Sequence, residues 1–181
     1  SGFIYASGFF WDSITISSTT LHAGFGGSAL YLSKLNAANG NLIWAKVIEG
    51  DGIKEITDIE IDENLNVYIT GHYNQTITFD NATYQPNGNI SGFIAKYNGS
   101  GLEEWTANLG ETASTYGKHI LVDSGMVYLV GNFDGQITIG DSSFISGAND
   151  NNGFLAKWTS MGQFQWAKEM TGVGDLDIAD I

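Results

Sequence analysis

Histidine and carboxylate side chains offer this chain its opportunities for acid–base or metal chemistry. The three histidines are His22, His72 and His119, and the last of them is in register with two acidic residues. Asp58, His119 and Asp180 follow one another at steps of 61 residues. Carboxylate oxygens and imidazole nitrogens both bind divalent cations. These three residues are therefore the candidates for a cation or sugar site, with calcium as the ion to test.

A second acidic segment resembles a calcium loop only in part. Asp62, Asn64 and Asn66 have the one-three-five spacing of such a loop. The loop requires glycine at its sixth position and glutamate at its twelfth, where this chain has Val67 and Tyr73. Asp and Asn side chains also favour turns, because they bond to their own backbone. The segment is predicted to be a turn between two strands, and no cofactor is predicted.

Nucleophilic catalysis has no support in the sequence. No serine, cysteine and histidine residues form a recognisable nucleophilic set, and no glycine-rich loop precedes a predicted helix. Glycoside hydrolysis needs two carboxylates across a cleft, and sequence spacing cannot place such a pair. We therefore expect no catalytic residues and no enzyme activity.

Composition excludes several classes of partner. The chain has 20 acidic residues, seven lysines and no arginine, and its net charge is −13. Phosphate recognition relies on clustered Lys and Arg, so a nucleic-acid partner is not expected. There is no cysteine, which excludes disulfides and thiolate metal sites. No run approaches the ~18 apolar residues of a membrane span, so membrane insertion is not expected either.

The elements that must position these residues are repeated. Trp44, Trp105 and Trp166 also stand 61 residues apart, and periods of this size are typical of solenoids and propellers. Two further sets of equivalent positions are Tyr5, Tyr68 and Tyr128, and Gly8, Gly71 and Gly131. The aromatic residues are predicted to pack in the core, and each Trp→Ala change to cost about 3–5 kcal/mol. The glycines are predicted to mark a bulge or a close backbone contact.

Each repeat predicts four strands, and the second repeat shows them most clearly. The predicted strands are residues 57–62, 66–73, 93–98 and 103–110, with a short hairpin at 76–85. They are rich in β-branched and aromatic residues, and Asn-Gly pairs predict tight turns. Four antiparallel strands per repeat indicate a β-propeller.

We therefore predict an all-β fold with about three four-stranded antiparallel blades in an incomplete ring. Residues 1–181 are expected to form one partial propeller domain, with repeats at roughly 1–58, 59–119 and 120–180. Ile181 is expected to open a further blade, because it stands as far after Trp166 as Ile120 stands after Trp105. The ring would be completed by the rest of a longer propeller or by a second copy of the chain.

The repeat resembles the bacterial SBBP-type β-propeller repeat. The resemblance rests on the segments GFIAKYNGSGLEEWTANLG and HILVDSGMVYLVGNF and extends over essentially the whole chain. The matching residues are Phe93, Ala95, Lys96, Tyr97, Gly101, Trp105, Ile120, Val122, Asp123, Val127, Tyr128 and Gly131. The resemblance implies a secreted or cell-surface bacterial protein, Bacteroidetes-like, with no shared catalytic residues.

The predicted function is that of a non-catalytic scaffold that binds a protein or a glycan through its loops. The loops around Ser17–Gly27, Asp80–Ile90 and Asp141–Asn152 differ most between repeats, and loops on a rigid scaffold commonly carry binding. The alternative is a glycan-cleaving or quinone-dependent enzyme with its site at the central channel. The segment YLSKLNAANGNLIWAKVIEG is similar to the repeat of quinone-dependent propellers, but their cysteine pair is missing here.

Overall fold

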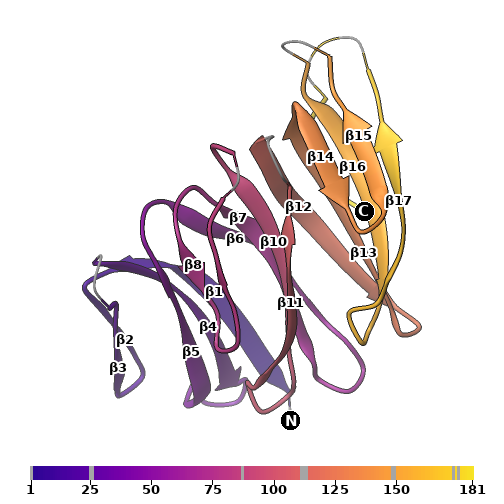
Figure 1. The fold of residues 1–181 in the computed structure, drawn as a ribbon. Coiled ribbons are helices and arrows are strands. Elements are labelled where there is room, and N and C mark those ends of the chain that lie inside the picture. Colours follow the sequence, from indigo (N-terminus) through magenta and orange to yellow (C-terminus); the bar gives the residue numbers. More distant parts are fainter. Residues whose placement is uncertain are drawn as a thin grey trace.

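The described residues form antiparallel strands and no helix (Figure 1). The fold comes from a computed structural model that describes residues 2–24, 27–86, 88–110, 114–147, 150–172, 174 and 176–181. None of these residues belongs to a helix of the length and apolarity needed to cross a membrane. The predicted all-β class is confirmed, and the arrangement is compatible with an incomplete propeller.

The second and third sheets each contain four strands in meander order. The second sheet consists of β6 (Lys54–Ile61), β7 (Val67–Tyr73), β10 (Ser91–Tyr97) and β11 (Glu103–Leu109). The third sheet consists of β12 (Ser114–Asp123), β13 (Met126–Asp134), β16 (Asn152–Thr159) and β17 (Phe164–Met170). The sheets stand side by side in Figure 1. The predicted order of four strands per repeat is therefore correct.

A short hairpin joins the second and third strands of each repeat, as the sequence predicts. The three hairpins are β2 (Ser13–Ile16) with β3 (Thr19–His22), β8 (Ile77–Thr78) with β9 (Thr83–Tyr84), and β14 (Gln136–Ile139) with β15 (Ser142–Ile145). The sequence did not predict that β8 also pairs with β5 of the preceding sheet, with Thr78 opposite Glu49. The β8–β9 hairpin therefore belongs to the second repeat in sequence, whereas β8 is hydrogen-bonded to β5 of the first sheet.

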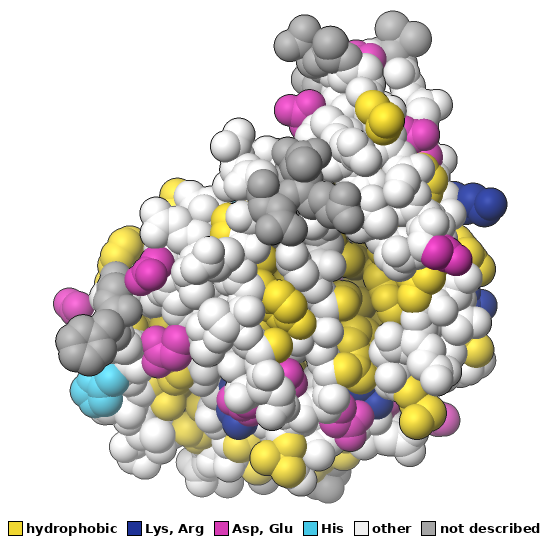
Figure 2. Space-filling model, viewed as in Figure 1, with side chains coloured by type: hydrophobic (Ala, Val, Ile, Leu, Met, Phe, Trp, Pro, Cys, Tyr) yellow, Lys and Arg dark blue, Asp and Glu magenta, His cyan; other side chains and the backbone are white. Residues whose placement is uncertain are grey.

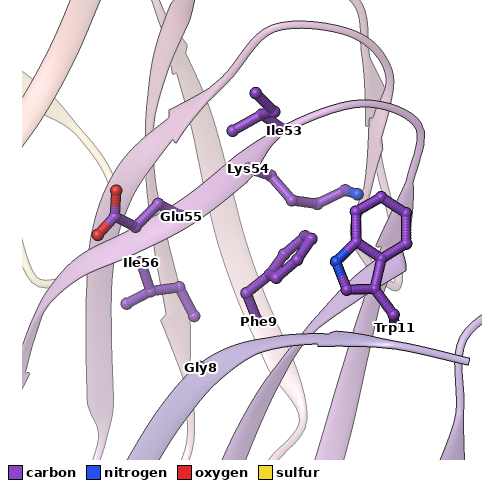
Figure 3. A pocket seen from close by; sticks show the side chains of 7 residues that line it. All are labelled: Gly8, Phe9, Trp11, Ile53, Lys54, Glu55 and Ile56. Carbon is purple, nitrogen blue, oxygen red and sulfur yellow. The ribbon is translucent and has the colours of Figure 1, made fainter. Parts of the chain in front are cut away.

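The first sheet begins with the strand equivalent to β7 and β13. It contains β1 (Phe3–Trp11), β4 (Ser28–Asn36) and β5 (Leu42–Gly50). Among the described strands, β1 pairs with β4 alone, so its other edge carries no strand partner. Figure 3 shows a hollow beside this open edge of β1.

Acidic side chains are spread over the face of the molecule that Figure 2 shows.

β6 and β12, which we call the inner strands, begin earlier than predicted, and a bulge in each explains its length. β6 starts at Lys54 and β12 at Ser114, so Asp58 and His119 lie within strands and not at their starts. Thr57 and Lys118 are the extra residues where the pairing of β6 with β7 and of β12 with β13 shifts register. A one-residue bulge breaks the two-residue alternation on which strand prediction depends, which is why the first half of each strand was missed.

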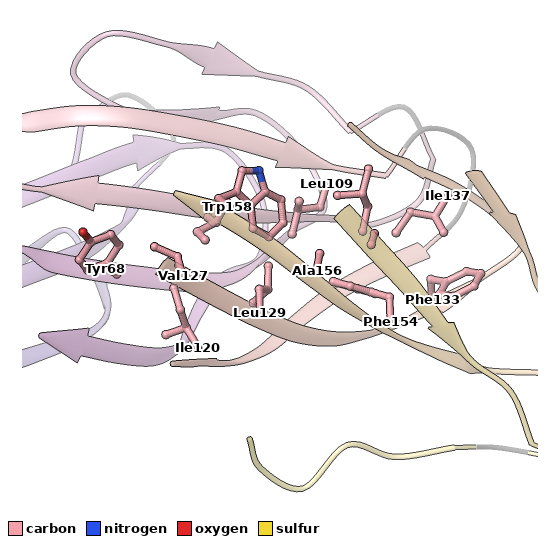
Figure 4. Packing of buried hydrophobic residues seen from close by; sticks show 13 residues of the cluster. Tyr68, Leu109, Ile120, Val127, Leu129, Phe133, Ile137, Phe154, Ala156 and Trp158 are labelled. Carbon is pink, nitrogen blue, oxygen red and sulfur yellow. The ribbon is translucent and has the colours of Figure 1, made fainter. Parts of the chain in front are cut away.

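The core lies between neighbouring sheets, because both faces of the middle sheet are covered. Val67 and Ile69 pack toward the first sheet, whereas Tyr68 belongs to the cluster shared with the third sheet (Figure 4). Side chains of a strand alternate between its two faces. Burial on both faces therefore removes the polar alternation of a half-exposed sheet, as the buried apolar segments of β7 and β10 indicate.

Residues 176–181 do not form the strand predicted at Ile181. A strand is defined by hydrogen bonds to a neighbouring strand, and these residues have no such neighbour among the described elements. Their path nevertheless follows that of an inner strand. Leu176 N donates to Asn151 O at 3.0 Å, and the equivalent bond one repeat earlier joins Thr115 N to Ile90 O, also at 3.0 Å.

Candidate functional site

Asp58 and His119, two of the three candidate cation ligands, face each other across the boundary between the second and third sheets. Asp58 Oδ2 lies 3.7 Å from His119 Nδ1. The same oxygen accepts a hydrogen bond of 2.9 Å from Ile120 N, and Asp58 Oδ1 accepts one of 2.9 Å from Ile59 N. Both oxygens of the carboxylate are therefore engaged by backbone donors, and one of these donors links the two sheets.

Asp180 repeats only the local part of this arrangement. Its Oδ1 accepts a hydrogen bond of 2.8 Å from Ile181 N, as Asp58 Oδ1 does from Ile59 N. Within the described ranges, no three or more His, Cys, Asp or Glu residues come together so that they could hold a metal ion. Asp58, His119 and Asp180 therefore do not form one coordination sphere.

The segment with calcium-loop spacing is a turn stabilised by its own aspartate. Asp62 Oδ1 accepts bonds of 2.9 Å from Asn64 N and from Asn66 N. Asp62 Oδ2 accepts from Asn66 Nδ2 at 2.7 Å and from Tyr68 OH at 3.3 Å. Both carboxylate oxygens thus have protein donors. The nearby cavity of about 370 Å³ is polar and lies against the corresponding β12–β13 turn, which includes Asp123.

The repeated tryptophans and lysines form a contact that sequence reasoning did not reveal. Trp44 Nε1 and Lys34 Nζ both donate to Gly99 O, each at 3.1 Å, and Gly99 lies in a turn of the next sheet. Trp105 Nε1 and Lys96 Nζ donate to Ser160 O at 3.1 and 2.9 Å in the same way. We call this pair of bonds the carbonyl clamp. It ties the outer part of one sheet to the β-turn of the next.

The clamp has one detectable signal in the sequence. Trp44 and Trp105 each donate to a residue 55 positions further along the chain. The positions of the two acceptors therefore recur with the repeat. Their side chains differ, because the acceptor is a backbone carbonyl and any residue supplies one. Side-chain periodicity identified the donors Trp44 and Trp105 but could not identify the acceptors Gly99 and Ser160.

The repeated tyrosine completes each clamp. Tyr5, Tyr68 and Tyr128 lie 6.1, 6.3 and 6.5 Å from the tryptophan of their own sheet, measured between ring centroids. Each tyrosine ring also lies beneath the lysine ammonium of that sheet, at distances of 5.4, 5.4 and 5.0 Å. An ammonium over an aromatic face is attracted by the ring quadrupole. Tyrosine, tryptophan and lysine are therefore one structural unit in each sheet.

The repeated glycines provide space for the inner strand just before its bulge. A Cβ added to Gly71 would lie 1.9 Å from Glu55 O, and one added to Gly131 would lie 2.1 Å from Tyr116 O. Such distances are far below van der Waals contact. At Gly8 the nearest atoms belong to the Tyr31 side chain, at 2.8 Å. The close approach of a backbone carbonyl to the repeated glycine thus occurs in the second and third sheets, which contain the inner strands β6 and β12.

An apolar hollow of about 390 Å³ lies between β1 and β6. Figure 3 shows Phe9 and Trp11 on one side and Lys54 reaching toward them from the other. Trp11 is 62% exposed. Lys54, which sequence reasoning missed, is buried and donates to Ser28 O, Ser28 Oγ and Gly52 O at 3.0–3.2 Å. Burial lowers the pKa of Lys54, although Asp51 and Glu49 favour its charged form.

The three hairpins carry the exposed side chains that vary between repeats. A hydroxyl pair bridges the two strands of each hairpin, with oxygen–oxygen distances of 3.0 Å for Thr15 and Thr20, 3.2 Å for Thr78 and Thr83, and 2.9 Å for Thr138 and Ser143. Other hairpin positions differ, including Ile145, which is 70% exposed. Of the predicted variable loops, residues 25, 26, 87, 148 and 149 lie outside the described residues.

No family model matches the chain. The chain is 26% identical over 156 residues to an uncharacterized WD repeat-containing protein of Acanthamoeba polyphaga mimivirus. The match covers 75% of this chain and 11% of the viral protein's length. The similarity suggests a repeat protein of β-propeller type, in agreement with the three antiparallel sheets.

Proposed function

We propose that the chain is part of a non-catalytic β-propeller scaffold that binds a protein partner through its hairpin-bearing surface. The observation that carries the proposal is the contrast between constant contacts inside the molecule and variable side chains on the hairpins. The carbonyl clamp recurs with nearly the same distances at both sheet boundaries. The hairpins keep their position in each repeat while their exposed residues change. Variable residues on a rigid support are typical of recognition surfaces.

The engagement of the two aspartates that were considered as cation ligands also favours a scaffold. Both oxygens of Asp58 and of Asp62 accept hydrogen bonds from the protein itself. These bonds give both carboxylates a role in holding a turn or a sheet boundary. The enzyme is therefore the alternative rather than the proposal.

The finer assignment rests on sequence resemblance. The SBBP-type pattern supports a partial propeller domain over residues 1–181 of a secreted or cell-surface bacterial protein. The similarity to a WD repeat-containing protein supports the propeller scaffold, and the protein partner is part of the proposal. The match covers only 11% of that relative's length. The proposed function is therefore inferred from the repeats of this chain alone.

The test compares hairpin variants with a variant in a turn at the other edge of a sheet. The 181-residue chain would be screened on protein and glycan arrays and against a panel of glycoside substrates. His22→Lys and Ile145→Lys change exposed hairpin positions that differ between repeats. Glu63→Lys changes an exposed residue in the turn between β6 and β7, at the edge of the second sheet opposite β11.

The expected result is binding to a protein that both hairpin variants reduce at least tenfold and that Glu63→Lys leaves unchanged. Binding that only Glu63→Lys abolishes would place recognition at the edge formed by the inner strands and not on the hairpins. Binding to glycans alone would replace the protein partner by a carbohydrate, and turnover of a glycoside would establish the enzyme.

A further inference from the structure

A polar cavity lies between the turn that joins β6 to β7 and the turn that joins β12 to β13. Its volume is about 370 Å³, which is within the range of about 300–1,000 Å³ found for ligand sites. Asp62, Glu63 and Asn64 line it from the second sheet, and Asp123 and Ser124 line it from the third. We call it the turn cavity. Both of its walls belong to four-stranded sheets, so it is formed by the boundary between two whole repeats.

Hydrogen bonds hold the walls of the turn cavity in place. Asp62 accepts four of them, all from the β6–β7 turn and the start of β7. Ser160, which also lines the cavity, donates its N–H to Gly125 O at 2.9 Å. The carbonyl of Ser160 accepts the clamp bonds of Trp105 and Lys96. The clamp therefore fixes the two walls relative to each other, and a site that is formed before binding loses less entropy when a ligand enters.

Two carboxylates in the turn cavity have oxygens to offer a ligand. Glu63 and Asp123 are exposed and come from opposite walls. Asp123 Oδ1 accepts the hydroxyl of Ser124 at 3.1 Å, and its Oδ2 has no hydrogen bond within the described ranges. The ion pairs that the described lysines form with acidic residues involve other carboxylates, namely those of Asp80, Glu104 and Asp177. The cavity thus presents acceptors without a cation of the chain's own.

The chemistry of the turn cavity fits the guanidinium group of an arginine. Carboxylates on two walls suit a planar group with five N–H donors, because such a group can bond to two partners at once. A metal ion is a poorer fit. Among the described residues, no three acidic or histidine side chains gather closely enough to hold one, and both oxygens of Asp62 already accept protein donors. The net charge of −13 also attracts a cationic partner.

Exposed apolar side chains stand beside the turn cavity on both walls. Leu65 lies between the lining residues Asn64 and Asn66 and is 39% exposed. Met161 follows the lining residue Ser160 and is 79% exposed. Leu65 has a φ of +64°, which is an unfavourable conformation for a bulky side chain. Strained residues cluster at ligand sites, and apolar side chains beside an arginine site are typical of protein interfaces.

We propose that the turn cavity binds an arginine side chain of a partner protein. Glu63 and Asp123 hold the guanidinium from two sides, and apolar residues next to the arginine pack against Leu65 and Met161. The proposal goes beyond the proposed function, because the cavity lies at the edge formed by the inner strands and not on the hairpins. It therefore adds a second contact surface with a partner of defined chemistry.

Peptides that contain arginine test the proposal, and citrulline separates charge from shape. The probe is a set of fluorescent hexapeptides with a central arginine between leucine or isoleucine residues. In the control set, citrulline, the uncharged analogue, replaces arginine. Fluorescence polarisation at low ionic strength should show at least tenfold tighter binding of the arginine set, since bonds between charged groups are lost in the other. Equal affinity for both sets, or no binding of either, would overturn the proposal.

Variants of the two carboxylates test where the guanidinium lies. Glu63→Gln and Asp123→Asn should each weaken binding of the arginine peptides about tenfold. Asp141→Asn is the matched control and should bind like the wild type. Asp141 is also an exposed turn residue that accepts the hydroxyl of the following serine, and it does not line the cavity. Equal weakening by Asp123→Asn and Asp141→Asn would mean that overall charge attracts the peptide, and it would overturn the proposal.

Leu65→Gly separates binding from folding. Glycine adopts positive φ without strain, so the melting temperature should stay the same or rise. Peptide affinity should nevertheless fall several-fold, because the apolar contact is lost. Unchanged affinity of this variant would overturn the apolar contact that the proposal includes.

The same variants distinguish this proposal from the proposed function. Glu63→Lys should abolish binding of the arginine peptides and leave the hairpin partner bound. His22→Lys and Ile145→Lys should do the reverse. Loss of both ligands in all three variants would contradict two separate surfaces.

Discussion

Lys34 and Lys96 show how a single residue type can connect sheets in an acidic protein. A buried ammonium is costly unless it is paired and hydrogen-bonded. Lys96 donates to Ser160 O at 2.9 Å, pairs with Glu104 at 2.7 Å and lies 5.4 Å over Tyr68. These contacts offset the cost of burial and fix the position of the neighbouring turn. Three of the seven lysines occupy this position, which assigns them to the scaffold and not to a ligand site.

Two tryptophans that are equivalent in sequence are expected to differ in energetic importance. Trp105→Ala removes a bond to Ser160 O and the contact with Gly162, so unfolding free energy should fall by about 3–5 kcal/mol. Among the described residues Trp166 makes neither contact, so Trp166→Ala should cost clearly less than Trp105→Ala. Urea unfolding of the two variants measures both losses. Equal losses would show that the clamp adds nothing to burial.

His72 is expected to make stability depend on pH near neutrality. Burial lowers its pKa, the Glu55 carboxylate opposes this, and the Lys118 ammonium adds to it. The neutral form is thus favoured in the folded state and the unfolded state binds the proton more readily. Stability is fully present above the unfolded pKa of 6.5 and is lost as pH falls through it toward the lower folded value.

The matched variant is His72→Asn, because Asn132 occupies the equivalent position one repeat later. Between about pH 7.5 and 5.5 the wild-type unfolding free energy should decrease more than that of the variant, since most carboxylates titrate below this window. Chemical unfolding at several pH values gives the two slopes. Parallel slopes would mean that His72 is equally protonated in both states.

At the scale of elements, the bulged inner strand determines where glycine is indispensable. The Cβ of Gly71→Ala would lie 1.9 Å from Glu55 O, and backbone cannot move aside as a side chain can. We expect this variant to lose at least about 3 kcal/mol of stability. Gly8→Ala meets only the Tyr31 side chain, which can rotate, and should lose less stability. Thermal melts of the two variants compare them, and similar losses would assign the cost to the side-chain contact.

Sequence patterns predicted the elements whose side chains repeat and missed those that depend on backbone. The tryptophan spacing was sufficient to predict the strand order and the hairpins, because each strand carries a repeated side chain. The early starts of β6 and β12 were missed because bulges at Thr57 and Lys118 disturb the alternation. Asp58 and His119 were predicted to be near each other, and they are. Their engagement by backbone amides could not be read from residue types.

At the scale of the molecule, each sheet is stabilised by the faces of its neighbours. One apolar cluster joins the first and second sheets. Another, shown in Figure 4, joins the second and third sheets. The middle sheet is the only one of the three described sheets with partners on both faces. In repeat proteins, stability is approximately the sum of the repeats and their interfaces, so the middle sheet should be the last to open.

Amide hydrogen exchange can measure this order. Amides of β7 and β10 should exchange most slowly, because every β10 residue and most β7 residues are buried. Amides of β1 on its open edge should exchange fastest among the second strands, since no inner strand covers them. Equal protection of β1 and β7 would contradict the dependence of each sheet on its neighbours.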